Sequence, residues 1–160
     1  MSTQYVALTA RDAYDICFAC KRGEIDSVLK LLADDPDLDI CVEDDYPFRA
    51  ACEHGHLNII KFLLVYSQVN AAACDNYALK HAALNGHLDV VQYLLKNCPT
   101  VDPSAENNYA IRWATHCGHY KIAKILAEND RVSETWDFVM PEIDEMDESE
   151  KTKCCGCVII

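Results

Sequence analysis

Residues 77–86, YALKHAALNG, decide the fold, because the same ten-residue pattern returns three more times without a gap. The other copies are YDICFACKRG from Tyr14, YPFRAACEHG from Tyr46 and YAIRWATHCG from Tyr109. Their first residues are spaced 31 or 32 positions apart. A sequence that resembles itself at a period between about 20 and 50 residues is typical of a repeat array.

Each copy is followed by a second apolar segment, such as HLDVVQYLL after Gly86. Apolar residues recur at helical spacing on both sides of that glycine, with Leu79 and Ala83 before it and Val91 and Leu94 after it. We therefore predict two short antiparallel helices per unit, joined at a glycine in the left-handed conformation. Helices this short are unstable alone, so neighbouring units must cover one another in a solenoid. The four glycines are Gly23, Gly55, Gly86 and Gly118.

The repeated units resemble the ankyrin repeat over about residues 10 to 130. The family pattern T-P-L-H-x-A-A-x-x-G-H-x-x-V-V-x-x-L-L corresponds to YPFRAACEHGHLNIIKFLL and YALKHAALNGHLDVVQYLL. The resemblance implies an all-α ankyrin-repeat solenoid of four helix-turn-helix repeats with finger loops, followed by a disordered acidic tail. Tyrosine replaces the opening threonine in all four units, and arginine, lysine or cysteine replaces the histidine. The usual Thr–His hydrogen bond is therefore missing.

The expected organisation has three parts. Residues 1–13 form an N-terminal cap, residues 14–140 form the ankyrin-repeat domain with a C-terminal cap at 128–140, and residues 141–160 form an acidic linker with a lipidated tail. Glu24 takes the place of the histidine that follows the glycine in the other units, which is typical of a polar end cap. Turn-forming residues are expected near the finger tips, namely Asp44, Asp45, Asp75, Asn76, Asn107 and Asn108. Trp136, Phe138 and Val139 are expected to cover the fourth unit.

The net charge, the apolar runs and the cysteine content limit the classes of function that we expect. Twenty-six acidic residues against fourteen basic ones give a net charge of −12, which repels nucleic acid and anionic membrane surfaces. The sequence has no apolar run long enough to span a bilayer and no Sec signal at its start, so we expect neither a transmembrane nor a Sec-secreted protein. Seven of the ten cysteines are scattered through the helical pattern, which favours free thiols in a reducing cytosol.

The ankyrin resemblance implies a concave groove, lined by the first helices and the fingers, that binds a protein partner. Aromatic side chains on a rigid surface bury much area at little entropic cost, so Trp113, His81 and Phe18 are the main candidates. The alternative is that Trp113 and Phe18 pack against the fingers. The full set of groove candidates is Phe18, Lys21, Arg22, Ala50, Glu53, His54, His81, Leu84, Trp113 and His116.

Two groups of residues resemble metal or redox sites. Cys17-x-x-Cys20 has zinc or redox spacing, but both residues fall at repeat positions that face other helices, which favours a structural role. His54 with His56, and His116 and Cys117 with His119, invite a metal interpretation. However, His56 and His119 occupy the glycine-histidine position of the repeat. We expect no metal site, no cofactor and, because no catalytic motif is present, no enzymatic activity.

The last four residues, Cys157-Val158-Ile159-Ile160, fit the CaaX prenylation box, and the ending resembles the tails of Ras- and Rho-like GTPases. Isoleucine at the last position favours geranylgeranyl over farnesyl. One lipid chain anchors a protein weakly, so S-acylation at Cys154 or Cys155 is the expected second anchor. The alternative is that the terminal VII sequence docks as an apolar end.

The segment PEIDEMDESEKTK reads as an extended, solvated spacer between the repeats and the lipid. Its acidic run also resembles the signal of effectors exported by type IV secretion systems. The repeats themselves look like arrays common in amoeba-infecting bacteria and giant viruses. These resemblances suggest an effector that a host cell lipidates after secretion.

Three hypotheses follow. The first is a monomeric, membrane-tethered adaptor, in which the groove binds a protein while prenylated Cys157, the product of a prenyltransferase, holds it on the cytosolic face of a eukaryotic membrane. The second is a soluble competitor or scaffold that masks a host protein and whose tail is incidental. The third is metal-dependent chemistry through the cysteine and histidine residues.

Overall fold

The computed structural model describes residues 10–66, 68–129 and 132, and it divides the chain into two compact units, Met1–Asn70 and Ala71–Ile160. The first unit contains helices α1 (Ala10–Arg22), α2 (Ile25–Asp34), α3 (Val42–Glu53) and α4 (Leu57–Tyr66). The second unit contains α5 (Ala73–Leu84), α6 (Leu88–Asn97), α7 (Ala105–His116) and α8 (Tyr120–Ala127). The described residues are all-α with no strand, as the sequence predicts.

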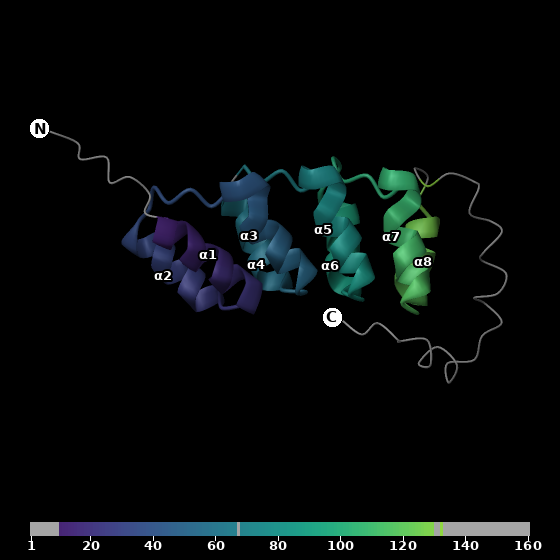
Figure 1. Cartoon of the computed structure of the whole chain (residues 1–160), viewed down its shortest axis with the longest axis horizontal. Coiled ribbons are helices and arrows are strands. Elements are labelled where there is room, and N and C mark those ends of the chain that lie inside the picture. Colours follow the sequence, from purple (N-terminus) through teal and green to yellow (C-terminus); the bar gives the residue numbers. More distant parts are fainter. Residues whose placement is uncertain (1–9, 67, 130–131, 133–160) are drawn as a thin grey trace, which may run out of the picture. The chain divides into compact units, whose positions relative to one another are not determined.

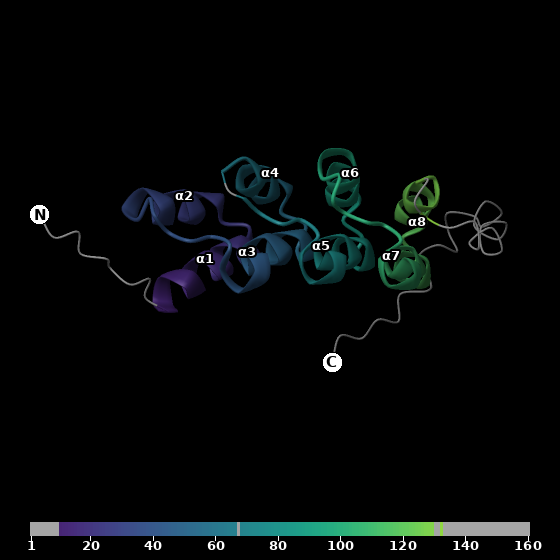
Figure 2. The same ribbon diagram turned by 90° about the horizontal axis from the view of Figure 1, so that it is seen from above.

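Each unit consists of two helix pairs in two layers. In the first unit, α1 packs against α2 and α3, and α3 packs against α4. In the second unit, α5 contacts α6 and α7, and α8 contacts α6 and α7. Figure 2 shows α1 and α3 in one layer with α2 and α4 in the other, and the same division between α5 with α7 and α6 with α8. Successive repeats therefore stack first helix on first helix within a unit.

Apolar side chains on the inner faces of the helices form the core. Ile16, Phe48 and Val28 are fully buried in the first unit, as are Leu79 and Ile111 in the second. The helices are 8 to 13 residues long, too short to be stable alone in water. Burial of these faces against the neighbouring repeat, at about 25 cal/mol per Å² of apolar surface, is what stabilises them.

A glycine ends the first helix of every repeat, as predicted. Gly23, Gly55, Gly86 and Gly118 have φ of 76°, 76°, 81° and 77°. The next residue donates its backbone N–H to a carbonyl five residues back, as from Glu24 to Ala19 at 3.0 Å. This is the hydrogen bond of a Schellman cap, which reverses the chain into the second helix.

Left-handed turns introduce the first helices of repeats two, three and four, and the repeat pattern did not predict them. Three consecutive residues in each turn have φ between 50° and 61°. They are Glu43, Asp44 and Asp45, then Cys74, Asp75 and Asn76, then Glu106, Asn107 and Asn108. The six turn-forming residues identified in the sequence are all here. They lie at the starts of the first helices, directly before each tyrosine.

Two of these turn residues bind the finger segment that follows their own repeat. Asp45 and Asn76 are each less than a tenth exposed. Asp45 Oδ2 accepts a hydrogen bond from the backbone N–H of Asn70 at 3.1 Å, and Asn76 Oδ1 accepts one from the N–H of Asp102 at 2.8 Å. The same position therefore binds the finger that follows the repeat.

The predicted N-terminal cap, residues 1–13, lies largely outside the described residues. So do the C-terminal cap beyond Asn129, apart from Val132, and the whole predicted linker and tail, residues 141–160. The expected roles of Trp136, Phe138, Val139 and the three cysteines of the tail therefore stay predictions.

Candidate functional site

In the first, third and fourth repeats, the opening tyrosine pairs with the groove candidate one helical turn later. The Tyr14 and Phe18 rings stack with centroids 6.1 Å apart, and Tyr77 stacks on His81 at 3.8 Å. In the fourth repeat, the Tyr109 and Trp113 rings lie 5.8 Å apart at 39°. Side chains four residues apart share a face of a helix. The tyrosine that replaces the family threonine thus supports the aromatic side chain beside it.

The second repeat differs, and it corrects one predicted groove residue. Ala50, four residues after Tyr46, is only 2% exposed, so its methyl group is buried and does not reach a partner. The alanine leaves the tyrosine ring without an aromatic neighbour on this face. The Arg49 guanidinium occupies that place, with its carbon 5.5 Å from the ring centroid of Tyr46.

The arginines that replace the family histidine hold the left-handed turns in place. Arg49 donates to the carbonyl oxygens of Glu43 at 2.8 Å and Asp44 at 2.9 Å. Arg112, at the same position two repeats later, donates to the carbonyl of Glu106 at 3.2 Å. These charge-assisted bonds satisfy carbonyl groups at the start of the helix, where the Thr–His pair of the family motif is absent.

Lys80 fills this position in the third repeat and acts between repeats. Its side chain is 10% exposed, and its ammonium lies 2.8 Å from Glu106 Oε1 in the next turn. The same ammonium lies 5.4 Å from the centroid of the Tyr109 ring, a cation–π contact. The third and fourth repeats are therefore joined through side chains on the face that carries Trp113.

Most of the other predicted groove residues reach the surface. Phe18 and Trp113 are 44% and 36% exposed, and their ring contacts involve residues of their own helices, including the edge of His116 against Trp113 at 5.3 Å. Both rings therefore keep area for a partner. Lys21, Arg22, His54 and His116 are exposed, whereas Glu53, His81 and Leu84 are half-buried.

A hollow of about 500 Å³ lies between α1 and α3 in the first unit. It contains two predicted residues, Phe18 and Lys21, and we call it the α1–α3 hollow. The other residues that line it are Tyr14, Cys17, Val42, Glu43 and Tyr46, which the sequence interpretation missed. A signal for the tyrosines was present, because both open a repeat and Tyr14 stands four residues before Phe18.

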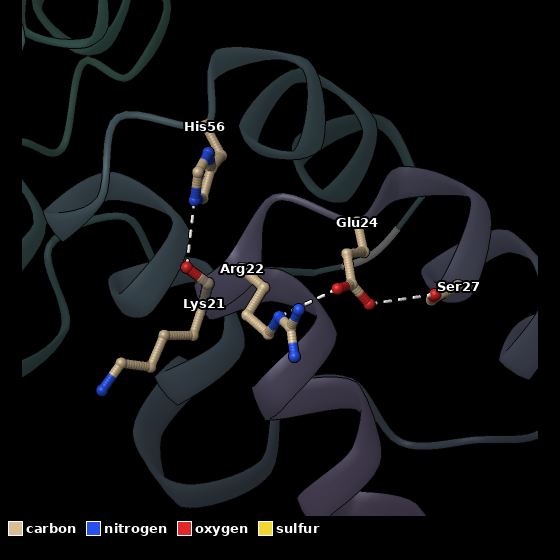
Figure 3. Close-up of polar contacts among 5 residues, drawn as sticks. All are labelled: Lys21, Arg22, Glu24, Ser27 and His56. Carbon is tan, nitrogen blue, oxygen red and sulfur yellow. Dashed lines mark hydrogen bonds and ion pairs between the residues drawn. The ribbon is translucent and has the colours of Figure 1, made fainter.

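The end of α1 carries the polar residues drawn in Figure 3. Arg22 pairs with Glu24 at 2.9 Å, and Ser27 donates to the same carboxylate at 3.2 Å. The Lys21 carbonyl accepts a hydrogen bond from His56 Nε2 at 3.0 Å, which fixes the backbone of this end. The Lys21 ammonium points away from these groups (Figure 3), and in the described part of the chain it has no ion-pair partner.

The glycine-histidine position also joins repeats. His56 Nε2 donates to the carbonyl of Lys21 in the preceding repeat, and His119 Nε2 donates to that of Leu84 at 3.1 Å. A carbonyl oxygen only accepts, so Nε2 carries the proton in both rings. These two histidines have structural partners, which explains their place in the repeat without a metal.

Cys17 and Cys20 are inert thiols in this environment. Burial, with a smaller effect of Glu43, raises the pKa of Cys17 to about 11. Burial, with a smaller effect of Cys17, raises the pKa of Cys20 to about 12. The thiolate is the reactive and metal-binding form, so both groups stay protonated at neutral pH. Within residues 10–66, 68–129 and 132, no three cysteine, histidine or acidic side chains gather as a metal site would require.

No helix among the described residues is long and apolar enough to cross a membrane. The arrangement as a whole offers exposed aromatic and charged side chains on short, tightly packed helices.

Comparison with known proteins identifies the repeat. The family model for ankyrin repeats, which spans three copies, matches this chain over residues 16–107 and again over residues 67–135. The two matches together cover well over half of the 160 residues. No curated protein matches the sequence. Ankyrin repeats are a protein-interaction module, which agrees with the exposed aromatic side chains found in each unit. The chain belongs to the ankyrin-repeat family.

Proposed function

We propose that this protein is a membrane-tethered adaptor, in which the ankyrin face binds a partner protein and a prenyl group on Cys157 holds the complex at a membrane. The observation that supports the binding half is the set of exposed aromatic rings on the first helices. Phe18 and Trp113 keep 44% and 36% of their surface exposed. Each ring contacts the ring of a tyrosine four residues earlier in its own helix.

Rigid, exposed aromatic rings are the usual anchors of protein interfaces. They lose few rotamers on binding and bury a large area, so a few of them account for most of the binding energy. Stacking on a tyrosine restricts the rings further, which reduces the ordering cost at association. The exposed polar side chains Lys21, Arg22 and His116 would then select among partners.

The membrane half depends on the tail. Prenylation of Cys157 supplies one hydrocarbon chain, and S-acylation of Cys154 or Cys155 supplies the second that stable anchoring needs. The expected lipid is geranylgeranyl, with farnesyl as the other candidate. The location proposed is the cytosolic face of a eukaryotic membrane, which for a secreted effector is a membrane of the host.

The tether is tested by expressing the wild type and Cys157→Ser in eukaryotic cells and separating membrane from cytosol. The proposal expects the wild type in the membrane fraction and the variant in the cytosol, with a prenyl mass on the wild-type terminus only. Cys154→Ser/Cys155→Ser should give weaker membrane retention with the prenyl group intact. An equal soluble distribution of wild type and Cys157→Ser would reject the tether and leave the soluble competitor.

The binding face is tested by proximity labelling around the wild type, Phe18→Ala and Trp113→Ala. Leu29→Ala is the matched control, because Leu29 is 46% exposed but lies on the second helix α2. Proteins labelled around the wild type and Leu29→Ala, and lost with either aromatic variant, are the expected partners. Identical labelling with all four proteins would contradict a role for these aromatic side chains.

A further inference from the structure

We infer that the α1–α3 hollow binds one large apolar side chain of an extended partner segment, with a basic residue of that segment beside Glu43 and an acidic one beside Lys21. This inference rests on the proposed protein-binding function and specifies the chemistry of the partner.

The hollow is lined by a complete stripe of helix α1. Tyr14, Cys17, Phe18 and Lys21 follow the spacing i, i+3, i+4, i+7, which places them on one face. The core uses other positions of the same helix, including Ile16, which is fully buried. Tyr14 is 67% exposed and Phe18 is 44% exposed, so both rings remain accessible to a partner after this unit has folded.

The walls of the hollow favour an apolar occupant. The rings of Tyr14 and Phe18 stand on one side and Tyr46 on the other, across from α1. Ligand pockets in proteins are lined mainly by hydrophobic and aromatic side chains, with a few polar groups that fix the orientation of the ligand. The volume of about 500 Å³ accommodates a tryptophan, phenylalanine or leucine side chain together with the adjoining main chain.

The polar groups of the hollow have opposite charges and do not neutralise each other. Lys21 and Glu43 both line it, and among the described residues neither side chain has an ion-pair partner. The cations nearby are already engaged, because Arg22 pairs with Glu24 and Arg49 donates to turn carbonyls. One anchor side chain with a cation on one side and an anion on the other therefore complements the hollow.

Charge complementarity also limits what fits. A segment with two acidic residues would place one of them against Glu43, and a segment with two basic residues would place one against Lys21. Like charges at such positions are unfavourable, whereas each exposed opposite pair changes affinity by about 2- to 5-fold. The mixed segment is preferred whichever way it runs, because reversing an extended chain exchanges its two ends.

The test uses the full chain made in bacteria, so that it carries no lipid, and three fluorescein-labelled heptapeptides with a central tryptophan. The tryptophan is flanked at two positions by Lys and Glu, by Lys and Lys, or by Glu and Glu, with glycine elsewhere. Fluorescence anisotropy at low salt should show the mixed peptide binding about 2- to 5-fold more tightly than either like-charged peptide. The difference should shrink at high salt.

Charge reversal provides the sharpest readout. Lys21→Glu should shift the preference to the Lys–Lys peptide, and Glu43→Lys should shift it to the Glu–Glu peptide. The Lys21 bond to His56 uses the backbone carbonyl, and Glu43 offers its carbonyl to Arg49, so neither reversal removes these contacts. Three peptides that bind equally to the wild type, or preferences that do not follow the reversals, would overturn the inference.

The apolar anchor is tested separately. Phe18→Ala and Tyr14→Ala should each lower the affinity for the mixed peptide about 10-fold or more, while Leu29→Ala leaves it unchanged. Phe18 also borders a smaller hollow between α1 and α2, so both aromatic variants must weaken binding for the α1–α3 hollow to be the site. Deletion of residues 2–9 should leave the affinity unchanged. A large gain would instead mean that the chain's own N-terminal segment occupies the hollow.

These results separate the inference from the proposed function. If cells yield partners that depend on Trp113 while the peptides show no preference, only the chemistry assigned to the hollow fails. If no partner depends on Phe18 or Trp113, the proposed binding function fails, whatever the peptides do.

Discussion

At the scale of single residues, the position before the repeat tyrosine shows how a carboxylate and an amide differ in the cost of being buried while they make the same hydrogen bond. Asp45 and Asn76 occupy it in successive repeats, and both accept a backbone N–H from the following finger. Asparagine brings no charge. Asp45 is buried, and its Oδ1 has no hydrogen-bond partner. A buried carboxylate oxygen without a partner is costly, because it loses water and gains nothing in exchange.

We expect Asp45→Asn to stabilise the protein by about 1 kcal/mol, because the accepting oxygen remains and the buried charge disappears. The reciprocal change, Asn76→Asp, should destabilise it by about 1–3 kcal/mol. Urea unfolding of the wild type and both variants at pH 7 measures the two changes. A loss of stability in Asp45→Asn would show that the carboxylate itself is needed at this site.

The buried thiol of Cys20 predicts a dependence of stability on alkaline pH. Burial raises its pKa from 9.0 to about 12, so between these values the folded protein holds a proton that the unfolded chain has released. Stability contributed by this thiol is complete below pH 9 and falls as pH rises toward 12, by at most about 1.4 kcal/mol per pH unit. Unfolding free energies of the wild type should therefore decline more steeply than those of Cys20→Ala above pH 9, and in parallel below pH 8. Equal slopes above pH 9 would mean that the thiol ionises freely in the folded state.

At the scale of the helix pair, one glycine and one histidine act together. Gly86 has φ of 81°, and a Cβ built there would lie 2.6 Å from Cε1 of His119. The ring is held in that place by its hydrogen bond to the Leu84 carbonyl. Two separate reasons therefore favour glycine here: the positive φ of the backbone, and the lack of space for a Cβ beside the His119 ring of the next repeat.

We expect Gly86→Ala to destabilise the protein by about 2–4 kcal/mol, through the left-handed backbone and the displaced ring. His119→Ala should cost about 1 kcal/mol for the lost hydrogen bond. In the double variant the ring is gone, so the combined loss should be smaller than the sum by at least about 0.5 kcal/mol. Thermal unfolding of the four proteins completes the cycle, and strict additivity would contradict the contact.

The helix pairs could be predicted from the sequence, whereas the turns that introduce them could not. Helical periodicity and the four glycines predicted the helix pairs, because both signals are local. The left-handed turns were not predicted, since Glu43, Cys74 and Glu106 have no preference for positive φ and only their Asp and Asn neighbours suggest a turn. Arginine contacts with the turn carbonyls stabilise the helix starts of repeats two and four, and these contacts become visible only in three dimensions.

The proposed binding residues were predictable in the same partial way. The repeat register identified Phe18 and Trp113 as surface candidates, but it also assigned Ala50, which is buried. The α1–α3 hollow combines residues of two repeats, so no single motif describes it. The position of a residue in the repeat predicts the side of the helix on which it lies. Its solvent exposure depends in addition on its own size and on the size of its neighbours.

At the scale of the whole molecule, charge and the proposed lipid oppose each other. The chain has a net charge of −12, and eight acidic residues lie between Glu134 and Glu150 with no basic residue among them. Many lipid-anchored proteins add a polybasic segment that is attracted to anionic lipids. Here only two lysines, Lys151 and Lys153, lie between the acidic run and Cys157. Two basic residues are fewer than a polybasic segment has, so the attraction has to come mainly from the hydrocarbon.

The proposed tether therefore predicts an unusual lipid preference. Protein geranylgeranylated in vitro at Cys157 should bind vesicles of neutral phosphatidylcholine more tightly than vesicles containing about 30% phosphatidylserine, because an anionic surface repels the acidic body and spacer. Raising the salt concentration should narrow the difference by strengthening binding to the anionic vesicles, since screening shortens the repulsion. Vesicle co-sedimentation measures both effects, with the unmodified chain as the control that binds neither kind of vesicle.

Substitution of Glu142, Asp144 and Glu145 by Gln should raise binding to the anionic vesicles and leave binding to the neutral vesicles unchanged. Tighter binding to phosphatidylserine by the wild type would show that some basic surface, rather than the lipid alone, brings the protein to the membrane.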